Sequence, residues 1–120
     1  MTRKRSKAEK NGRRAERWAA LYLMLTGWRI VGRRVRSPRG EVDIVARRGK
    51  TLCFIEVKWR GSREELDTAI TAPRLRRVAA AAETIASRYA KAGDTQRIDV
   101  MLMAPRSWPR RVVNAWQPGT

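Results

Sequence analysis

Four charged side chains stand on two short apolar segments of the chain, Glu41 and Asp43 on the first and Glu56 and Lys58 on the second. Both segments have the composition of strands. A two-residue turn at Arg48-Gly49 would join them into a hairpin, since glycine accepts the backbone conformation that tight turns require. Side chains alternate along a strand and paired residues share a face, so all four charged groups are expected to project from one side.

This turn predicts that Glu41 faces Glu56 and that Asp43 faces Phe54. Like charges directly across a strand pair destabilise it unless something positive lies between them. A divalent cation would do this, because Asp43 and Glu56 are then diagonal neighbours whose carboxylates can converge on one ion. The backbone carbonyl of Val57 could supply a third oxygen. Hard oxygen ligands of this kind suit Mg²⁺ or Mn²⁺.

The same side carries Lys58, which could orient an attacking water or offset charge on a phosphate. The chain has no histidine and a single cysteine, Cys53, which excludes disulfides, zinc ribbons and catalysis by Cys–His or Ser–His pairs. Any catalysis must therefore use carboxylates, lysine and metal, with the metal lowering the pKa of its bound water. The alternative stays open here, because Glu-x-Lys on a strand is commonly a solvated face with a weak ion pair.

The composition indicates a polyanionic partner. With 28 basic and 11 acidic residues, the 120-residue chain carries a net charge of +17, far more than solubility requires. Nucleic acid is the expected partner, and DNA is favoured over RNA. The length suits a single domain over residues 11–120 behind a basic flexible arm over residues 1–10. No apolar run is long enough for a bilayer and no signal segment follows the basic start, so we expect a cytoplasmic protein with no membrane partner.

Hydrophobic spacing predicts a first helix from about Ala8 until Gly27. Glu16 lies at the edge of its apolar stripe, which consists of Ala15, Trp18, Ala19, Tyr22 and Leu25.

A second and clearer stripe predicts a long helix over Ala72–Lys91. Strands are expected at Trp28–Arg36, Glu41–Ala46, Thr51–Trp59, Arg97–Ala104 and Val112–Trp116. The side of the hairpin away from the acids is expected to pack on the long helix; it carries Val42, Ile44, Cys53, Ile55, Val57 and Trp59.

The segments G-E-V-D-I and F-I-E-V-K-W-R together resemble the nuclease motif of the restriction-endonuclease-like superfamily, the PD-(D/E)xK enzymes. More closely, the chain resembles the YraN family of small bacterial proteins predicted to be endonucleases. That likeness runs from about Gly12 to Trp116 and includes G-x-x-A-E, R-I-D-V and N-A-W. It departs from the family pattern at Arg74, where a lysine is usual.

The resemblance implies an α/β fold with a central mixed sheet flanked by helices, similar to archaeal Holliday junction resolvases. It makes Asp43 and Glu56 the principal metal ligands, adds Glu16 from the first helix to the metal site, and makes Lys58 the catalytic lysine. Glu41 is either a further ligand or a neighbour of the ligands.

We therefore expect a Mg²⁺-dependent endonuclease acting on DNA, with branched or otherwise structured DNA among its substrates. The rival hypotheses are a nucleic-acid-binding protein that keeps the fold without catalysis, and an interaction domain for an acidic protein. Dimerisation through an exposed Trp59, Trp108 or Trp116 is a further expectation. Arginines expected to contact phosphates are Arg33, Arg34, Arg36, Arg39, Arg47, Arg60, Arg74, Arg76 and Arg77.

Overall fold

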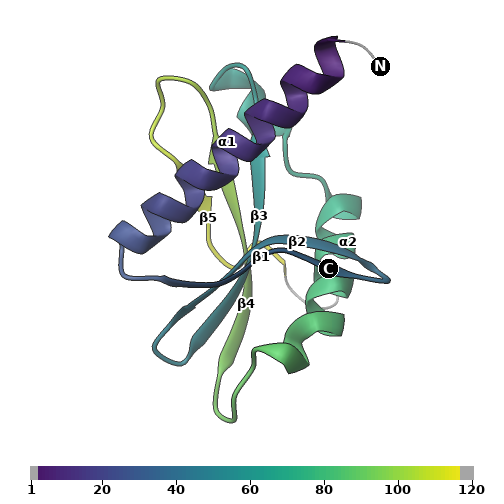
Figure 1. Cartoon of the computed structure of the whole chain (residues 1–120), viewed down its shortest axis with the longest axis vertical. Coiled ribbons are helices and arrows are strands. Elements are labelled where there is room, and N and C mark those ends of the chain that lie inside the picture. Colours follow the sequence, from purple (N-terminus) through teal and green to yellow (C-terminus); the bar gives the residue numbers. More distant parts are fainter. Residues whose placement is uncertain (1–2, 117–120) are drawn as a thin grey trace.

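A mixed sheet runs through the middle of the protein, with one long helix on each face (Figure 1). The computed structural model describes residues 3–116, and the side chains of residues 11–66 and 68–116. The five strands lie in the order β1-β2-β3-β4-β5, and only β3 and β4 are parallel. The predicted α/β class with a central mixed sheet is confirmed. The elements are α1 (Arg3–Leu25), β1 (Arg29–Ser37), β2 (Gly40–Arg48), β3 (Thr51–Trp59), α2 (Ala72–Ile85), β4 (Thr95–Met103) and β5 (Arg110–Val112).

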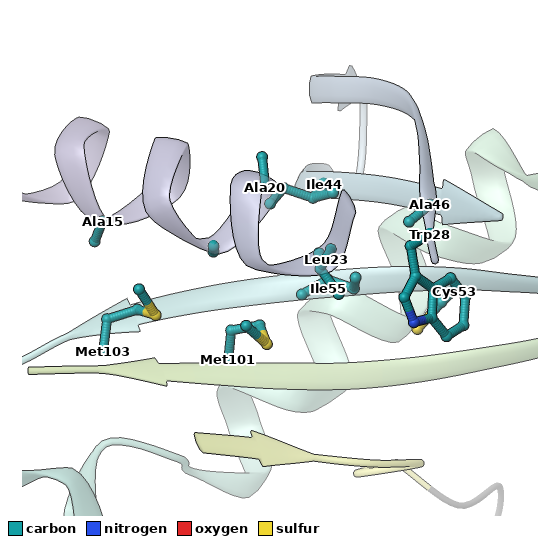
Figure 2. Close-up of a cluster of buried hydrophobic side chains, with 11 residues drawn as sticks. Ala15, Ala20, Leu23, Trp28, Ile44, Ala46, Cys53, Ile55, Met101 and Met103 are labelled. Carbon is teal, nitrogen blue, oxygen red and sulfur yellow. The ribbon is translucent and has the colours of Figure 1, made fainter. Parts of the chain in front are cut away.

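Small residues bring α1 close to the sheet. Ala15, Ala19 and Leu23 are buried in one cluster with Ile44 and Ile55 of the hairpin. Figure 2 shows Leu23 beside Ile44 and Ile55, and Ala15 nearer to Met103. The helix begins at Arg3, earlier than expected, while Met1 and Thr2 lie outside the described residues. Whether residues 1–10 move as an arm stays a prediction. No helix among the described residues has the length and apolar character that a membrane crossing requires.

The apolar stripe predicted for α1 is partly wrong. Trp18 is 59% exposed and Leu25 is 78% exposed, because the alanines, and not these large side chains, face the sheet. Ala15 and Ala19 of the predicted stripe are buried as expected. Four large apolar side chains of α1 are exposed: Trp18, Leu21, Met24 and Leu25.

The hairpin turn lies one residue later than predicted. Arg48 pairs with Thr51 and Ile44 with Ile55, so the turn is Gly49-Lys50, with Gly49 at φ 59. This position favours glycine, because the first central residue of such a turn has a positive φ. The predicted pairings of Asp43 with Phe54 and of Glu41 with Glu56 are wrong, but the turn has the same number of residues. Every side chain of β3 therefore keeps its predicted face.

The prediction of which helix covers which face is also wrong. Cys53 and Ile55 pack against α1, and Val57 and Trp59 pack against the same cluster. The long helix α2 covers the opposite face, where Ala81, Ala82 and Ile85 meet Val42, Leu52 and Phe54. Glu56 and Lys58 alternate with the α1-facing residues of β3, so they lie on the side of α2. The first turn of α2 can then reach them.

The ends of α2 and of the last strand differ from the predictions. The hydroxyl of Thr71 accepts the backbone N–H of Arg74 at 3.3 Å and caps the helix, as threonine commonly does. The α-helix ends at Ile85 and continues as a short 3₁₀ turn over Ala86–Arg88, so it is shorter than predicted. The last strand occupies Arg110–Val112 and not Val112–Trp116.

A buried ionic cluster ties this last strand to the sheet. Asp99 is fully buried and accepts hydrogen bonds from Arg97 at 2.9 and 3.0 Å, from Arg111, and from the backbone N–H of Asn114 at 2.8 Å. Burial opposes ionisation, yet the hydrogen bonds from Arg97 and Asn114 lower the pKa of Asp99 below its usual value. Both arginines also lie over the ring of Trp28. The cluster has a structural role.

Candidate active site

Glu56 lies at the centre of the candidate site. It is 2% exposed on β3, and its Oε1 accepts Arg74 Nε at 3.0 Å and Nη2 at 2.8 Å. Lys58 Nζ lies 3.4 Å from the same oxygen. The second oxygen, Oε2, is buried and has no hydrogen-bond partner among the described residues. A carboxylate oxygen without a partner in the interior is costly unless a cation or a donor occupies the space beside it.

Asp43 lies one residue beyond the last paired position of β2, Ile44 opposite Ile55. Its Oδ2 accepts the backbone N–H of Val57 at 2.7 Å, so the carboxylate bonds β3 where the backbone ladder has stopped. Burial raises the pKa of Asp43 to about 7, and the negative charge of Glu56 adds to this effect. Among the described residues, no lysine or arginine forms an ion pair with it.

The other two predicted acids are held by arginines of β1. Glu16 is 7% exposed on α1, and its Oε1 accepts Arg34 Nε at 3.2 Å and Arg33 Nη2 at 3.5 Å. Arg34 has a φ of 51, and the register of β1 shifts just before it. Glu41 is more exposed and pairs with Arg36 at 3.3 Å. Both charges contribute to the raised pKa of Asp43.

The structure therefore brings Asp43, Glu56 and Lys58 together, and it turns Glu16 and Glu41 toward arginines. Among the side chains of residues 11–66 and 68–116, no three of metal-binding type converge on one point. Two observations on the described residues nevertheless fit a divalent cation: Oε2 of Glu56 lacks a hydrogen-bond partner, and the partly buried Asp43 forms no ion pair. Carboxylate oxygens are the donors that Mg²⁺ and Mn²⁺ prefer.

The predicted phosphate contacts divide into two groups. Arg39, Arg74 and Arg77 line a small pocket of about 190 Å³ together with Glu41 and Asp43. The structure places Arg33, Arg34, Arg36, Arg60 and Arg76 on the surface or partly exposed.

Arg47 has a different environment. Its guanidinium bonds both oxygens of Asp94, at 2.9 and 2.7 Å, and the carbonyl of Tyr89 at 2.9 Å. This arginine joins β2 to the segment that precedes β4. It is committed to structural contacts.

The direct bond from Arg74 to Glu56 is the main feature that the sequence did not predict. The available signal was the helix start, because Thr71 and Pro73 place Arg74 in the first turn of α2. That signal does not show which face of the sheet the side chain of Arg74 will reach. Only the packing of α2 on the Glu56 side of the sheet makes the contact.

Residues 15–103 match the family described as "Uncharacterised protein family UPF0102". The protein belongs to this family. A UPF0102 protein from Sphingopyxis alaskensis is 63% identical, over 95% of this chain and 98% of the relative. Another, from Erythrobacter litoralis, is 59% identical over 96% of this chain and 99% of the relative.

A solved structure is also similar. It is Archaeoglobus fulgidus Hjc, described as a Holliday junction resolvase from an archaeal hyperthermophile. The TM-score is 0.58 at 25% identity, and the match covers 85% of this chain and 76% of that chain. The UPF0102 match contains Glu16, Asp43, Glu56 and Lys58, and it ends before the segment that joins β4 to β5. Family membership and fold similarity together support a nuclease-like, nucleic-acid-binding role.

Proposed function

We propose that this UPF0102 protein is a metal-dependent endonuclease that hydrolyses phosphodiester bonds of DNA, with branched or structured DNA as its substrate. One observation supports this most directly: Glu56 is buried beside Lys58 and the partly buried Asp43, and one oxygen of Glu56 has no hydrogen-bond partner among the described residues. The likeness to a Holliday junction resolvase supports the same class of reaction. A cytoplasmic location belongs to the same proposal.

The residues have distinct roles in this proposal. Asp43 and Glu56 would hold Mg²⁺ or Mn²⁺, with the backbone carbonyl of Val57 and the carboxylate of Glu16 as further oxygen donors. When bound, the ion supplies an acidified water and polarises the phosphate. Lys58 stands next to Glu56 and offsets charge that develops on the phosphate. No histidine is needed as a base.

The arginines around this site hold the DNA backbone. Arg39, Arg74 and Arg77 surround the pocket that contains Asp43, so a phosphate there would lie beside the acids. Phosphate contacts position the substrate without reading its sequence. Further contacts to the flanking backbone come from Arg33, Arg34, Arg36, Arg60 and Arg76.

A second candidate is a nucleic-acid-binding protein without catalysis. It is favoured by the ion pairs that already neutralise Glu16, Glu41 and Glu56. In that case the acids stabilise the fold, and the arginines that remain exposed bind phosphate.

A cleavage experiment separates the two candidates. Labelled duplex, four-way junction, single-stranded DNA and RNA are incubated with Mg²⁺, Mn²⁺ or chelator. Asp43→Asn and Lys58→Ala are compared with Glu83→Gln, which removes an exposed carboxylate of α2 away from the site. The nuclease proposal expects metal-dependent cleavage that the first two variants lose and the third keeps. Binding without cleavage of any substrate, in every metal, would reject it in favour of the second candidate.

A further inference from the structure

A groove of about 490 Å³ opens between α1 and the segment of residues 104–109 that joins β4 to β5. Its size lies within the range of roughly 300–1,000 Å³ that ligand sites occupy. Aromatic rings line it on several sides: Trp18 and Tyr22 from α1, Trp59 from β3, and Trp108 from the joining segment. None of these rings belongs to the acid site described above.

Two of the four rings lie open to water. Trp18 is 59% exposed and Trp108 is 84% exposed. Trp108 stands on a short segment bracketed by Pro105 and Pro109, and proline restricts the backbone before any ligand binds. Neither indole is needed to fill the core, so both are available to stack on a flat partner.

The charged residues that line the groove are both basic. They are Arg14 on α1 and Arg106 on the joining segment, and no aspartate or glutamate among residues 11–66 and 68–116 lines the groove. The occupant must therefore combine flat apolar faces with negative charge. A second copy of this chain carries +17 and would bring like charges to the same place. Unpaired nucleotides have both required properties, and proteins bind single strands by base stacking inside a basic groove.

We propose that this groove binds unpaired bases of DNA, with Trp18 and Trp108 stacking on the bases and Arg14 and Arg106 contacting the adjoining phosphates. The inference rests on the proposed function and narrows its substrate to DNA in which single-stranded nucleotides adjoin a duplex. Trp59 follows Lys58 directly on β3, so their side chains point to opposite faces of the sheet at the same strand end. A DNA strand that leaves the groove and passes around this end of β3 approaches the face of the sheet that carries Lys58.

The test is binding of fluorescein-labelled oligothymidine and of a blunt-ended duplex, measured by anisotropy in chelator so that nothing is cleaved. Trp108→Ala is expected to weaken oligothymidine binding about tenfold, the usual effect of losing one stacking ring, and to leave duplex binding unchanged. Trp108→Phe keeps a stacking face and should retain most of the affinity. Met24→Ala is the matched control, since Met24 is 51% exposed on α1 and lies outside the groove.

The outcomes separate this inference from the proposed function. If the wild-type protein cleaves junctions while Trp108→Ala and Trp18→Ala bind oligothymidine like the wild type, the groove inference alone is overturned. If the wild type binds neither probe, the proposed function falls with it. Sedimentation supplies one more refutation: a dimer that either tryptophan substitution dissociates, at unchanged oligothymidine affinity, would identify a second copy as the occupant.

Discussion

Raising the pH should weaken the folded protein through one carboxyl group, that of Asp43. Burial and the nearby charge of Glu56 raise the pKa of Asp43 from 3.8 to about 7. Between these two values the folded state keeps a proton that the unfolded chain has already released. Stability therefore falls as the pH rises through this window and levels off above it. Asp43→Asn cannot ionise and removes the effect.

The magnitude follows from the displacement of the pKa. Each pKa unit corresponds to about 1.4 kcal/mol, so the change from 3.8 to about 7 corresponds to roughly 4 kcal/mol of lost stability for Asp43. Roughly 2 kcal/mol of this should be lost between pH 5 and pH 7. The chain has no histidine, so no imidazole titrates in the same range.

Urea unfolding in chelator at several pH values from 5 to 8 measures this effect. The wild type should lose stability across the range, Glu83→Gln should follow it, and Asp43→Asn should be nearly flat. Adding Mg²⁺ at pH 8 should restore part of the wild-type loss, because an ion that binds the ionised site stabilises the folded state. Parallel pH profiles for the wild type and Asp43→Asn would refute the reasoning.

Substitutions at three further places test other parts of the structure. Arg74→Ala removes the cation that pairs with Glu56 and should raise the Mg²⁺ affinity about tenfold in calorimetry, whereas Arg74→Lys should change it little. Equal Mg²⁺ affinities of the wild type and Arg74→Ala would exclude competition between Arg74 and the metal for Glu56. Asp99→Asn leaves the partly buried Arg97 and Arg111 without their counter-ion and should cost about 3–5 kcal/mol in urea unfolding. A loss within experimental error would contradict the structural role of Asp99. Gly32→Ala would place a methyl group 2.7 Å from a tyrosine hydroxyl and should cost about 1–3 kcal/mol, while Gly12→Ala meets nothing within 4 Å and should stabilise α1 by up to about 1 kcal/mol. A higher melting temperature for Gly32→Ala than for Gly12→Ala would show that the close contact with the tyrosine hydroxyl does not destabilise the protein.

The elements themselves were largely predictable because their signals are local. Alternation predicts β3 at Thr51–Trp59, and a hairpin turn of two residues keeps Glu56 and Lys58 on one face wherever the turn begins. The helix that covers each face is not a local property. It depends on the parallel pairing of β3 with β4 and on the hand of the connection through α2. For this reason the acids were assigned to the wrong side of the sheet.

The ion pairs of the site were not predictable for a different reason. Arginine side chains are long, and their partners depend on backbone irregularities far away in the sequence. Arg34 reaches Glu16 from a residue with positive φ after the register shift in β1. Arg47 was expected to contact phosphate, but it bonds Asp94, a residue that no pattern in the sequence singles out. The residue types at the site could be predicted from the sequence, whereas their ion-pair partners are determined by the three-dimensional fold.

The same pairing connects the binding of metal to the binding of DNA under the proposed function. Glu16, Glu41 and Glu56 each hold an arginine that was expected to contact phosphate, and Asp43 alone lacks a basic partner among the described residues. A DNA backbone competes with these carboxylates for the arginines, so bound phosphate releases oxygen atoms that can then hold a cation. A bound cation in turn releases arginines for phosphate. Linkage requires the two effects to be equal in free energy, so metal and DNA must each raise the affinity for the other by the same factor. On this reasoning, carboxylates turned toward arginines are what a nuclease site of this kind looks like before its substrate arrives.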